Sequence, residues 1–117
     1  MIDTDQLTQL VIDTLDDHKG LAITELDITA LTDIADRMII CTATSRRHGS
    51  ALADKVVMKS KEHEVQPLGV EGLESAEWIL IDLQDVIIHI MLQETRDFYS
   101  LEKLWQVVKD SRKQHKG

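Results

Sequence analysis

Cysteine and proline are almost absent from this sequence of 117 residues, which holds one of each. A single cysteine, Cys41, excludes an internal disulfide and is typical of proteins from a reducing compartment. No apolar run approaches the roughly 20 residues that a membrane helix needs. The first residues, MIDTDQLTQL, also lack the basic region and apolar block of a secretory signal. We therefore expect a cytoplasmic protein without membrane contact.

Aromatic residues are also scarce, at 3% of the chain, and all of them fall between residues 78 and 105. Trp and Tyr are residue types that often anchor protein interfaces. The alternative is that a chain with so few aromatic residues uses them to fill its single core. We favour the core for Phe98 and Trp105, and contact with a partner for Trp78 and Tyr99.

The composition that remains is that of an ordinary globular domain, with 43% hydrophobic and 29% charged residues. The length fits one domain with one core. The net charge of -8 is uneven: residues 1–36 hold nine Asp or Glu against one Lys, whereas residues 37–61 hold six Lys or Arg against one Asp. An acidic whole argues against free binding to a phosphate backbone and favours neutral or basic partners. The alternative is that these charges only keep the domain soluble.

Two apolar, β-branched runs, 78–83 and 86–92, predict an antiparallel hairpin around a two-residue turn at Gln84-Asp85. Alternation then puts six aliphatic side chains on one face, which we assign to the core: Ile79, Ile81, Leu83, Val86, Ile88 and Ile90. The other face carries mixed side chains: Trp78, Leu80, Asp82, Ile87, His89 and Met91. We assign this mixed face to a covering helix or to a partner.

The remaining elements follow from periodicity and turn residues. We predict helices over 4–18 and from Ser45 to 64, helical turns over 94–99, a last helical segment over 100–108, and strands over 21–28, 37–44 and 65–70. Gly20 should end the first helix in the left-handed conformation. Because Pro67 cannot donate, its strand should lie at an edge or make few hydrogen bonds at that point. Residues 1–108 then form one α/β domain, a mixed sheet of about five strands flanked by helices. The basic residues 109–117 should be a flexible tail.

The polar residues form no recognised catalytic or metal-binding motif. Five histidines without a paired spacing and a single cysteine give no zinc site, and we expect no metal or cofactor. Gly49-Ser50 suggests a nucleotidyltransferase, whose two carboxylates, spaced by one residue on a strand, hold Mg²⁺. The carboxylates here lie instead at a helix end or across a turn (Glu62, Glu64, Asp82 and Asp85). The catalytic core of such an enzyme is therefore missing.

His89 lies diagonal to Asp82 across the predicted hairpin, so a contact between them is expected on the mixed face. No Ser or Cys is placed to serve as a nucleophile beside this pair. We therefore favour a structural histidine over a catalytic one. Near the start of the second helix, three cations (Arg46, Arg47 and His48) oppose the helix dipole, so an anion or a nearby acidic surface should compensate them.

Four motifs along the chain occur together: EG at Glu71, W-x-x-x-D from Trp78, D-V-x-x-H from Asp85, and R-x-x-Y-x-L-E-x-L-W from Arg96. In this order they closely resemble the ribosomal silencing factor family, also called the Iojap family. The resemblance runs from the first helix to Trp105. It implies a fold related to nucleotidyltransferases without their catalytic carboxylates, and no enzyme activity.

The resemblance also implies a function. Members of the family bind ribosomal protein fourteen on the large subunit, block docking of the small subunit and lower translation when nutrients are short. The partner-facing positions implied by the motifs are Trp78, Asp82, Leu83, His89, Met91, Arg96 and Tyr99, supported by Leu101, Glu102 and Trp105. A large-subunit assembly factor and a nucleotidyltransferase-like enzyme are the alternatives. A secondary contact with ribosomal RNA and a homodimer remain open.

Overall fold

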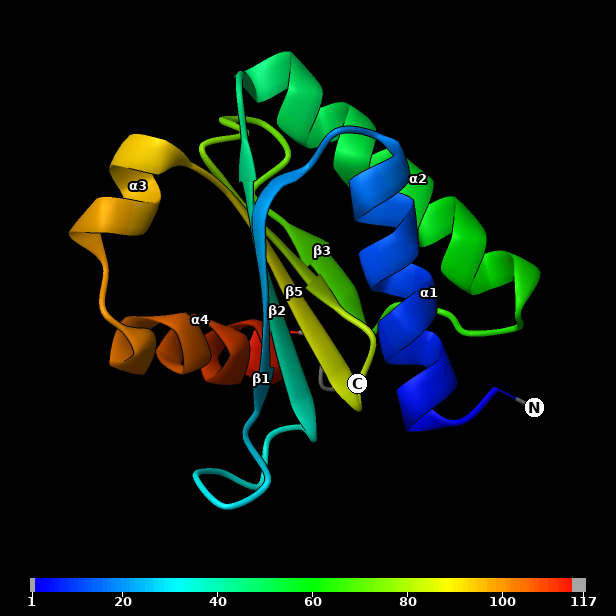
Figure 1. The fold of residues 1–117 in the computed structure, drawn as a ribbon. Helices are drawn as coiled ribbons and strands as arrows, with labels where there is room; N and C mark the ends of the chain where they lie inside the picture. The colour runs from blue at the N-terminus through cyan, green and yellow to red at the C-terminus, as the bar shows by residue number, and fades with distance from the viewer. Residues whose placement is uncertain (1, 115–117) are drawn as a thin grey trace.

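A computed structural model describes residues 2–114, which form one α/β domain as predicted. In chain order the elements are α1 (Thr4–Asp17), β1 (Leu21–Asp27), β2 (Arg37–Ala43), α2 (Arg46–Glu62), β3 (Gly69–Glu71), β4 (Trp78–Asp82), β5 (Val86–Leu92), α3 (Gln93–Phe98) and α4 (Leu101–Gln114) (Figure 1). The five strands form one sheet in the order β1-β2-β5-β4-β3. β2 and β5 run parallel, and the other neighbours are antiparallel. The sheet is therefore mixed, as the sequence predicts.

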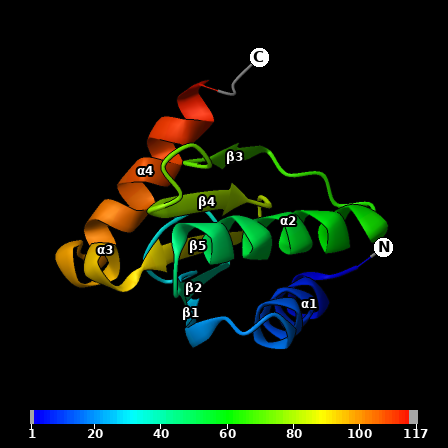
Figure 2. The same ribbon diagram turned by 90° about the horizontal axis from the view of Figure 1, so that it is seen from above.

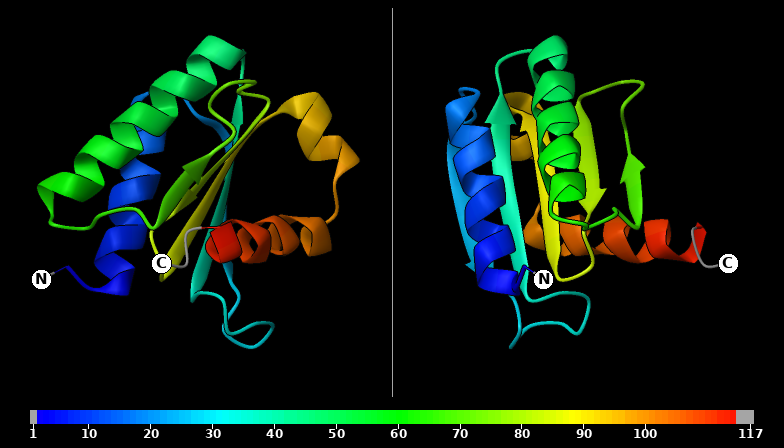
Figure 3. Two further views of the ribbon diagram at one scale, coloured as in Figure 1. Left: turned by 180° about the vertical axis from the view of Figure 1, so that it is seen from behind. Right: turned by 90° about the vertical axis from the view of Figure 1, so that its right-hand side faces the viewer.

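Helices cover both faces of the sheet. α1 and α2 lie on one face, and α3 and α4 lie on the other (Figure 2). α1 and α2 run side by side, whereas α4 crosses the strands on the far side (Figure 3). Each face has its own apolar cluster, one beneath α1 and α2 and the other beneath α4. A sheet that is covered on both faces explains why β2 and β5 read as nearly continuous apolar runs.

The central hairpin has the predicted register. Leu80 pairs with His89 and Ile81 with Ile88, and the amide of Leu83 donates to the carbonyl of Val86 at 3.0 Å. The aliphatic face belongs to the cluster beneath α1 and α2. The mixed face, which the sequence assigns to a helix or a partner, is covered by a helix, because Leu104 and Val108 of α4 pack on it.

The first helix ends differently from the prediction. Its start is closed by a capping box in which the carboxylate of Asp3 accepts from the amide of Gln6 and the Gln6 side chain accepts from the Asp3 amide. At its end the left-handed residue is Lys19, with φ of 68°, so the prediction for Gly20 is wrong. Gly20 is instead required by space, because a Cβ there would lie 2.6 Å from Sγ of Cys41. This close approach lets the chain enter β1 directly from the helix.

The third strand and the second helix also differ in detail from the predictions. β3 begins at Gly69, after Pro67, and lies at an edge of the sheet as predicted. At the start of α2, the side chain of Ser45 accepts from the amide of His48 at 3.0 Å. The guanidinium of Arg46 is 2.6 Å from a carboxylate oxygen of Glu77. A nearby acidic side chain therefore balances one of the three cations, Arg46, which is one of the two predicted solutions.

The last helix is longer than the sequence analysis predicts. α4 continues to Gln114, and Ser111 is buried while Arg112 makes several hydrogen bonds. The prediction of a flexible tail is therefore wrong for residues 109–114, and residues 115–117 lie outside the described part. The reason is tertiary, since these contacts join α4 to residues of the sheet and its loops far away in the sequence.

Cys41 lies fully buried in β2, as a small residue of the core. Burial raises the pKa of its thiol to about 11, so the reactive thiolate is scarce at neutral pH. Within residues 2–114, none of the helices is both long and apolar enough to cross a membrane.

Candidate partner-binding surface

An aromatic patch stands where α3 meets α4. We define this aromatic patch as Phe98, Tyr99 and Leu101, which are 76%, 39% and 44% exposed. The Tyr99 ring is 4.9 Å from that of Phe98 and 4.8 Å from that of Trp78, measured between centroids. Contiguous exposed apolar side chains on a small domain often mark a binding site. The prediction that Phe98 belongs to the core is wrong, because α3 has no buried residue and turns this ring outward.

Arg96 holds α3 in place rather than facing solvent. Its guanidinium donates to the carbonyl of Ala22 at 2.7 Å and to the hydroxyls of Thr42 and Thr24 at 2.9 and 2.8 Å. These acceptors belong to β1 and β2. Hydrogen bonds from a charged donor are stronger than those between neutral groups. These three bonds fasten α3, a helix of six residues none of which is buried, to the sheet. Arg96 therefore positions the aromatic patch from behind.

Trp78 supports the aromatic patch from below and is joined to His89. The indole Nε1 of Trp78 donates to Nδ1 of His89 at 2.8 Å. Because an indole nitrogen only donates, the neutral imidazole must carry its hydrogen on Nε2. Nε2 is buried and has no hydrogen-bond partner among the described residues. Burying such an unsatisfied donor lowers the free energy of unfolding by about 1–3 kcal/mol, so the packing beneath α4 is less stable at this point.

The stability of the protein should fall with acid because of His89. Burial lowers the pKa of this imidazole from 6.5 to about 3. Below pH 6.5 the unfolded chain therefore binds a proton on this imidazole that the folded protein does not bind. The stability present above pH 6.5 is lost as the pH falls toward 3. At about 1.4 kcal/mol per pH unit, the loss at pH 5 should be about 2 kcal/mol. Urea denaturation at pH 7 and pH 5 measures it.

The matched control is His89→Gln, whose amide oxygen can still accept from Trp78 but does not titrate. Both proteins keep the same carboxylates, so the difference between their two pH dependences isolates the imidazole. Equal losses of stability in the two proteins would show that His89 does not carry the effect.

Four of the residues that the motifs assign to partner contact are buried. Asp82, Leu83, His89 and Met91 are each 3% exposed or less. Leu83 belongs to the cluster beneath α1 and α2, whereas Met91 lies beneath α4. The expected contact between His89 and Asp82 is not formed. His89 bonds to Trp78, and Asp82 binds Arg112 at 2.7 Å.

The supporting residues Glu102 and Trp105 take different positions on α4. Glu102 is exposed in its first turn, and Trp105 packs half-buried against the cluster under this helix, as expected for the core. Sequence analysis missed Arg112, although a signal was present. Leu104, Val108 and Ser111 continue a helical spacing past the predicted end of the helix.

Carboxylates border the aromatic patch. A cavity of about 270 Å³ beside it is lined by Glu77, Leu92, Glu94, Thr95, Phe98 and Tyr99. Glu94 lies in the first turn of α3, and Glu77 forms an ion pair with Arg46. Apolar rings beside carboxylates fit a basic protein surface, because the rings bury area and the carboxylates pair with cations. Among residues 2–114, no three His, Cys, Asp or Glu side chains gather as a metal site.

Comparisons of the sequence and of the fold with those of known proteins agree with one another. Residues 2–116 match the sequence model of a family described as "Ribosomal silencing factor during starvation". A ribosomal silencing factor of Chromobacterium violaceum is 46% identical over 100 residues, which cover 86% of this chain and 82% of that protein. A crystal structure of a protein from Chromobacterium violaceum superposes with a TM-score of 0.84 at 44% identity, covering 90% of this chain and 88% of that one. A mouse protein named for mitochondrial assembly of the large ribosomal subunit is 36% identical over 73 residues, 60% of this chain and 32% of its own length.

Proposed function

Because this chain belongs to the ribosomal silencing factor family, a family of non-enzymatic translation regulators, we propose that it binds the large ribosomal subunit and blocks subunit joining. The docking site would be ribosomal protein fourteen on the face that meets the small subunit. Occupying that face would repress translation when nutrients are limited. A regulator of this kind works where ribosomes are, so we place it in the cytoplasm.

One observation carries this proposal: the aromatic patch, exposed beside carboxylates and supported by Trp78. We assign direct contact to Phe98, Tyr99, Leu101 and Glu102, and to the half-buried Trp78. The buried or hydrogen-bonded members of the motifs would hold these residues in place: Asp82, Leu83, His89, Met91, Arg96 and Trp105.

The mechanism is steric and needs no turnover. Ribosomal proteins are usually basic, so the net charge of -8 would speed their encounter with this chain. Desolvated aromatic anchors would then slow dissociation, because most differences in affinity between related complexes lie in the dissociation rate. Once the chain is seated, the small subunit would meet an occupied surface.

Co-sedimentation with purified ribosomal particles tests the proposal. The chain should sediment with isolated large subunits and not with isolated small subunits. Large subunits that have been incubated with it should form fewer whole ribosomes when small subunits are added. Binding to small subunits, or strongly salt-dependent binding to naked ribosomal RNA in place of the large subunit, would contradict the proposal.

The mouse relative favours a second candidate function, assembly of the large subunit, because its name states that role. Deleting the gene distinguishes the two functions. An assembly factor should leave immature large-subunit particles in a sucrose gradient, whereas a silencing factor should leave mature large subunits in normal amounts and raise translation during starvation.

A further inference from the structure

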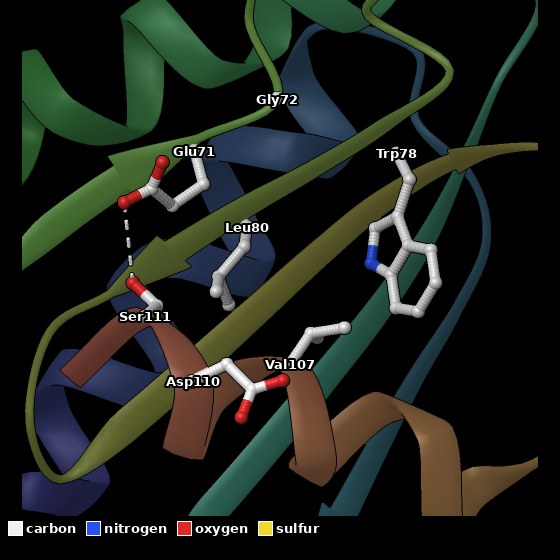
Figure 4. Close-up of a pocket in the computed structure, with 7 residues that line it drawn as sticks. All are labelled: Glu71, Gly72, Trp78, Leu80, Val107, Asp110 and Ser111. Carbon is white, nitrogen blue, oxygen red and sulfur yellow. Dashed lines mark hydrogen bonds between the residues drawn. The ribbon is translucent and has the colours of Figure 1, made fainter. Parts of the chain in front are cut away.

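We propose that the hollow between α4 and the β3-β4 edge receives a cationic side chain, lysine or arginine, from the bound partner protein. This inference rests on the proposed function and names a second anchor for it. We call this cavity the α4 hollow. Its volume is about 280 Å³, and its lining includes Glu71, Trp78, Leu80, Val107, Asp110 and Ser111 (Figure 4).

The size of the α4 hollow fits one side chain. Sites for small molecules and cofactors usually measure about 300–1,000 Å³. A cavity of about 280 Å³ lies just under that range. This volume is large enough for the end of a lysine or arginine side chain.

The walls of the α4 hollow have the chemistry of a cation site. Glu71 of β3 accepts from the hydroxyl of Ser111 at 3.4 Å, and Asp110 accepts from the Gln106 amide at 3.1 Å. These two carboxylates lie on opposite sides of the cavity, Glu71 on β3 and Asp110 on α4 (Figure 4). A cation between them would be attracted by both.

Apolar groups complete the α4 hollow. Leu80 is buried, and Val107 and the Trp78 ring are half-buried around it. The methylene stem of a lysine or arginine packs well on such surfaces, and its charged end is attracted to the face of an indole. These apolar surfaces favour an organic cation, because its carbon atoms can pack on them.

The α4 hollow is continuous with the aromatic patch through Trp78. One contact of this indole is the Tyr99 ring at 4.8 Å, and the indole also lines the hollow. A protein that covers the aromatic patch would therefore reach the opening of the hollow with its next side chain. Since Asp110 and Gly72 are exposed at this opening, no helix has to move to admit it.

A small-molecule titration tests the hollow by itself. The probe is N-acetyl-arginine methylamide, and its control is the citrulline analogue, which has nearly the same shape without the charge. We expect the arginine probe to shift the Trp78 indole signal in a ¹H–¹⁵N spectrum with saturation. Trp105→Phe identifies that signal. The citrulline analogue should give no saturable shift, and Glu71→Gln or Asp110→Asn should weaken the arginine probe at least fivefold. Equal shifts from both probes would overturn the inference.

Binding to large subunits tests the hollow in its proposed role. Asp110→Asn should weaken the affinity fivefold or more, because the partner cation loses one of its two carboxylates. The matched control is Asp54→Asn, which removes one exposed charge from α2 on the other face of the sheet and should change the affinity less than twofold. Equal effects from the two variants would refute the inference and leave the proposed function standing. If the unchanged chain does not bind large subunits, the proposed function fails, and the titration still decides whether the hollow takes a cation.

Discussion

Replacing Arg112 by alanine should lower the free energy of unfolding by about 3 kcal/mol or more, the usual cost of breaking a buried ion pair. The Asp82 side chain is 1% exposed, and the Arg112 side chain is 28% exposed. Two parallel contacts join them, from Nε to Oδ2 at 2.7 Å and from Nη2 to Oδ1 at 3.0 Å. Without the guanidinium, a carboxylate would remain buried under α4, with a hydrogen bond from the amide of Gln84.

Arg112 also joins three separate parts of the chain. It donates to the carbonyl of Ile34 at 2.6 Å, before β2, and to the carbonyl of Gln84 at 2.9 Å, in the turn of the hairpin. Its loss therefore leaves two carbonyls as well as a carboxylate without this donor. Because α4 covers Trp78 and Met91, we expect the variant to expose this face of the sheet before the rest unfolds.

Urea denaturation at pH 7 measures the effect of Arg112→Ala, with Lys109→Ala as control. Lys109 is an exposed cation of the same helix, and its loss should change stability by no more than about 0.5 kcal/mol. The double variant Asp82→Leu with Arg112→Met should recover most of the loss, because apolar residues of similar size leave no buried charge. If Arg112→Ala and Lys109→Ala are equally stable, the ion pair does not hold α4.

Replacing Phe98 and Tyr99 together by alanine should weaken binding to the large subunit about thirtyfold or more. Loss of one aromatic anchor at the centre of an interface costs about 2 kcal/mol, which is roughly thirtyfold in affinity. The double variant should remain folded, because both side chains are exposed and α3 is held by Arg96. Trp78→Ala is a poorer test, since it also removes the hydrogen bond to His89 from the core.

A titration of large subunits with labelled protein gives the affinity, and reassociation of the two subunits gives the function. Met58→Ala is the matched control, because Met58 is 44% exposed on α2, away from the aromatic patch. It should bind as the unchanged protein does. The aromatic patch would lose its assigned role if the folded double variant still kept the two subunits apart as well as before.

The hairpin was predictable because its signals are local. A two-residue connection between Leu83 and Val86 sets the pairing, and alternation then decides which side chains share a face. Every predicted cross-strand pair in β4 and β5 is present. The pattern left open what would cover the mixed face, since a helix and a partner protein would need the same apolar surface.

The aromatic residues were harder to place from sequence. Whether Phe98 points inward depends on how α3 sits on the sheet, and Arg96 decides that through contacts with residues 54 to 74 positions away. Composition alone favoured the core for Phe98, and the structure exposes it. Trp105 packs against the core as expected, because the turns of α4 around it face the sheet.

Local sequence was enough to predict the α/β class, the hairpin and its parity, the edge position of β3 and the family, since each depends on neighbours in the chain or on short motifs. The three-dimensional packing was needed to show that α4 covers the mixed face, that Asp82 and His89 are buried beneath it, and that Phe98 is exposed beside Tyr99. The physical reason is distance along the chain. The ion pair between residues 30 positions apart and the burial of His89 Nε2 without a partner among the described residues follow from packing, which no local periodicity encodes.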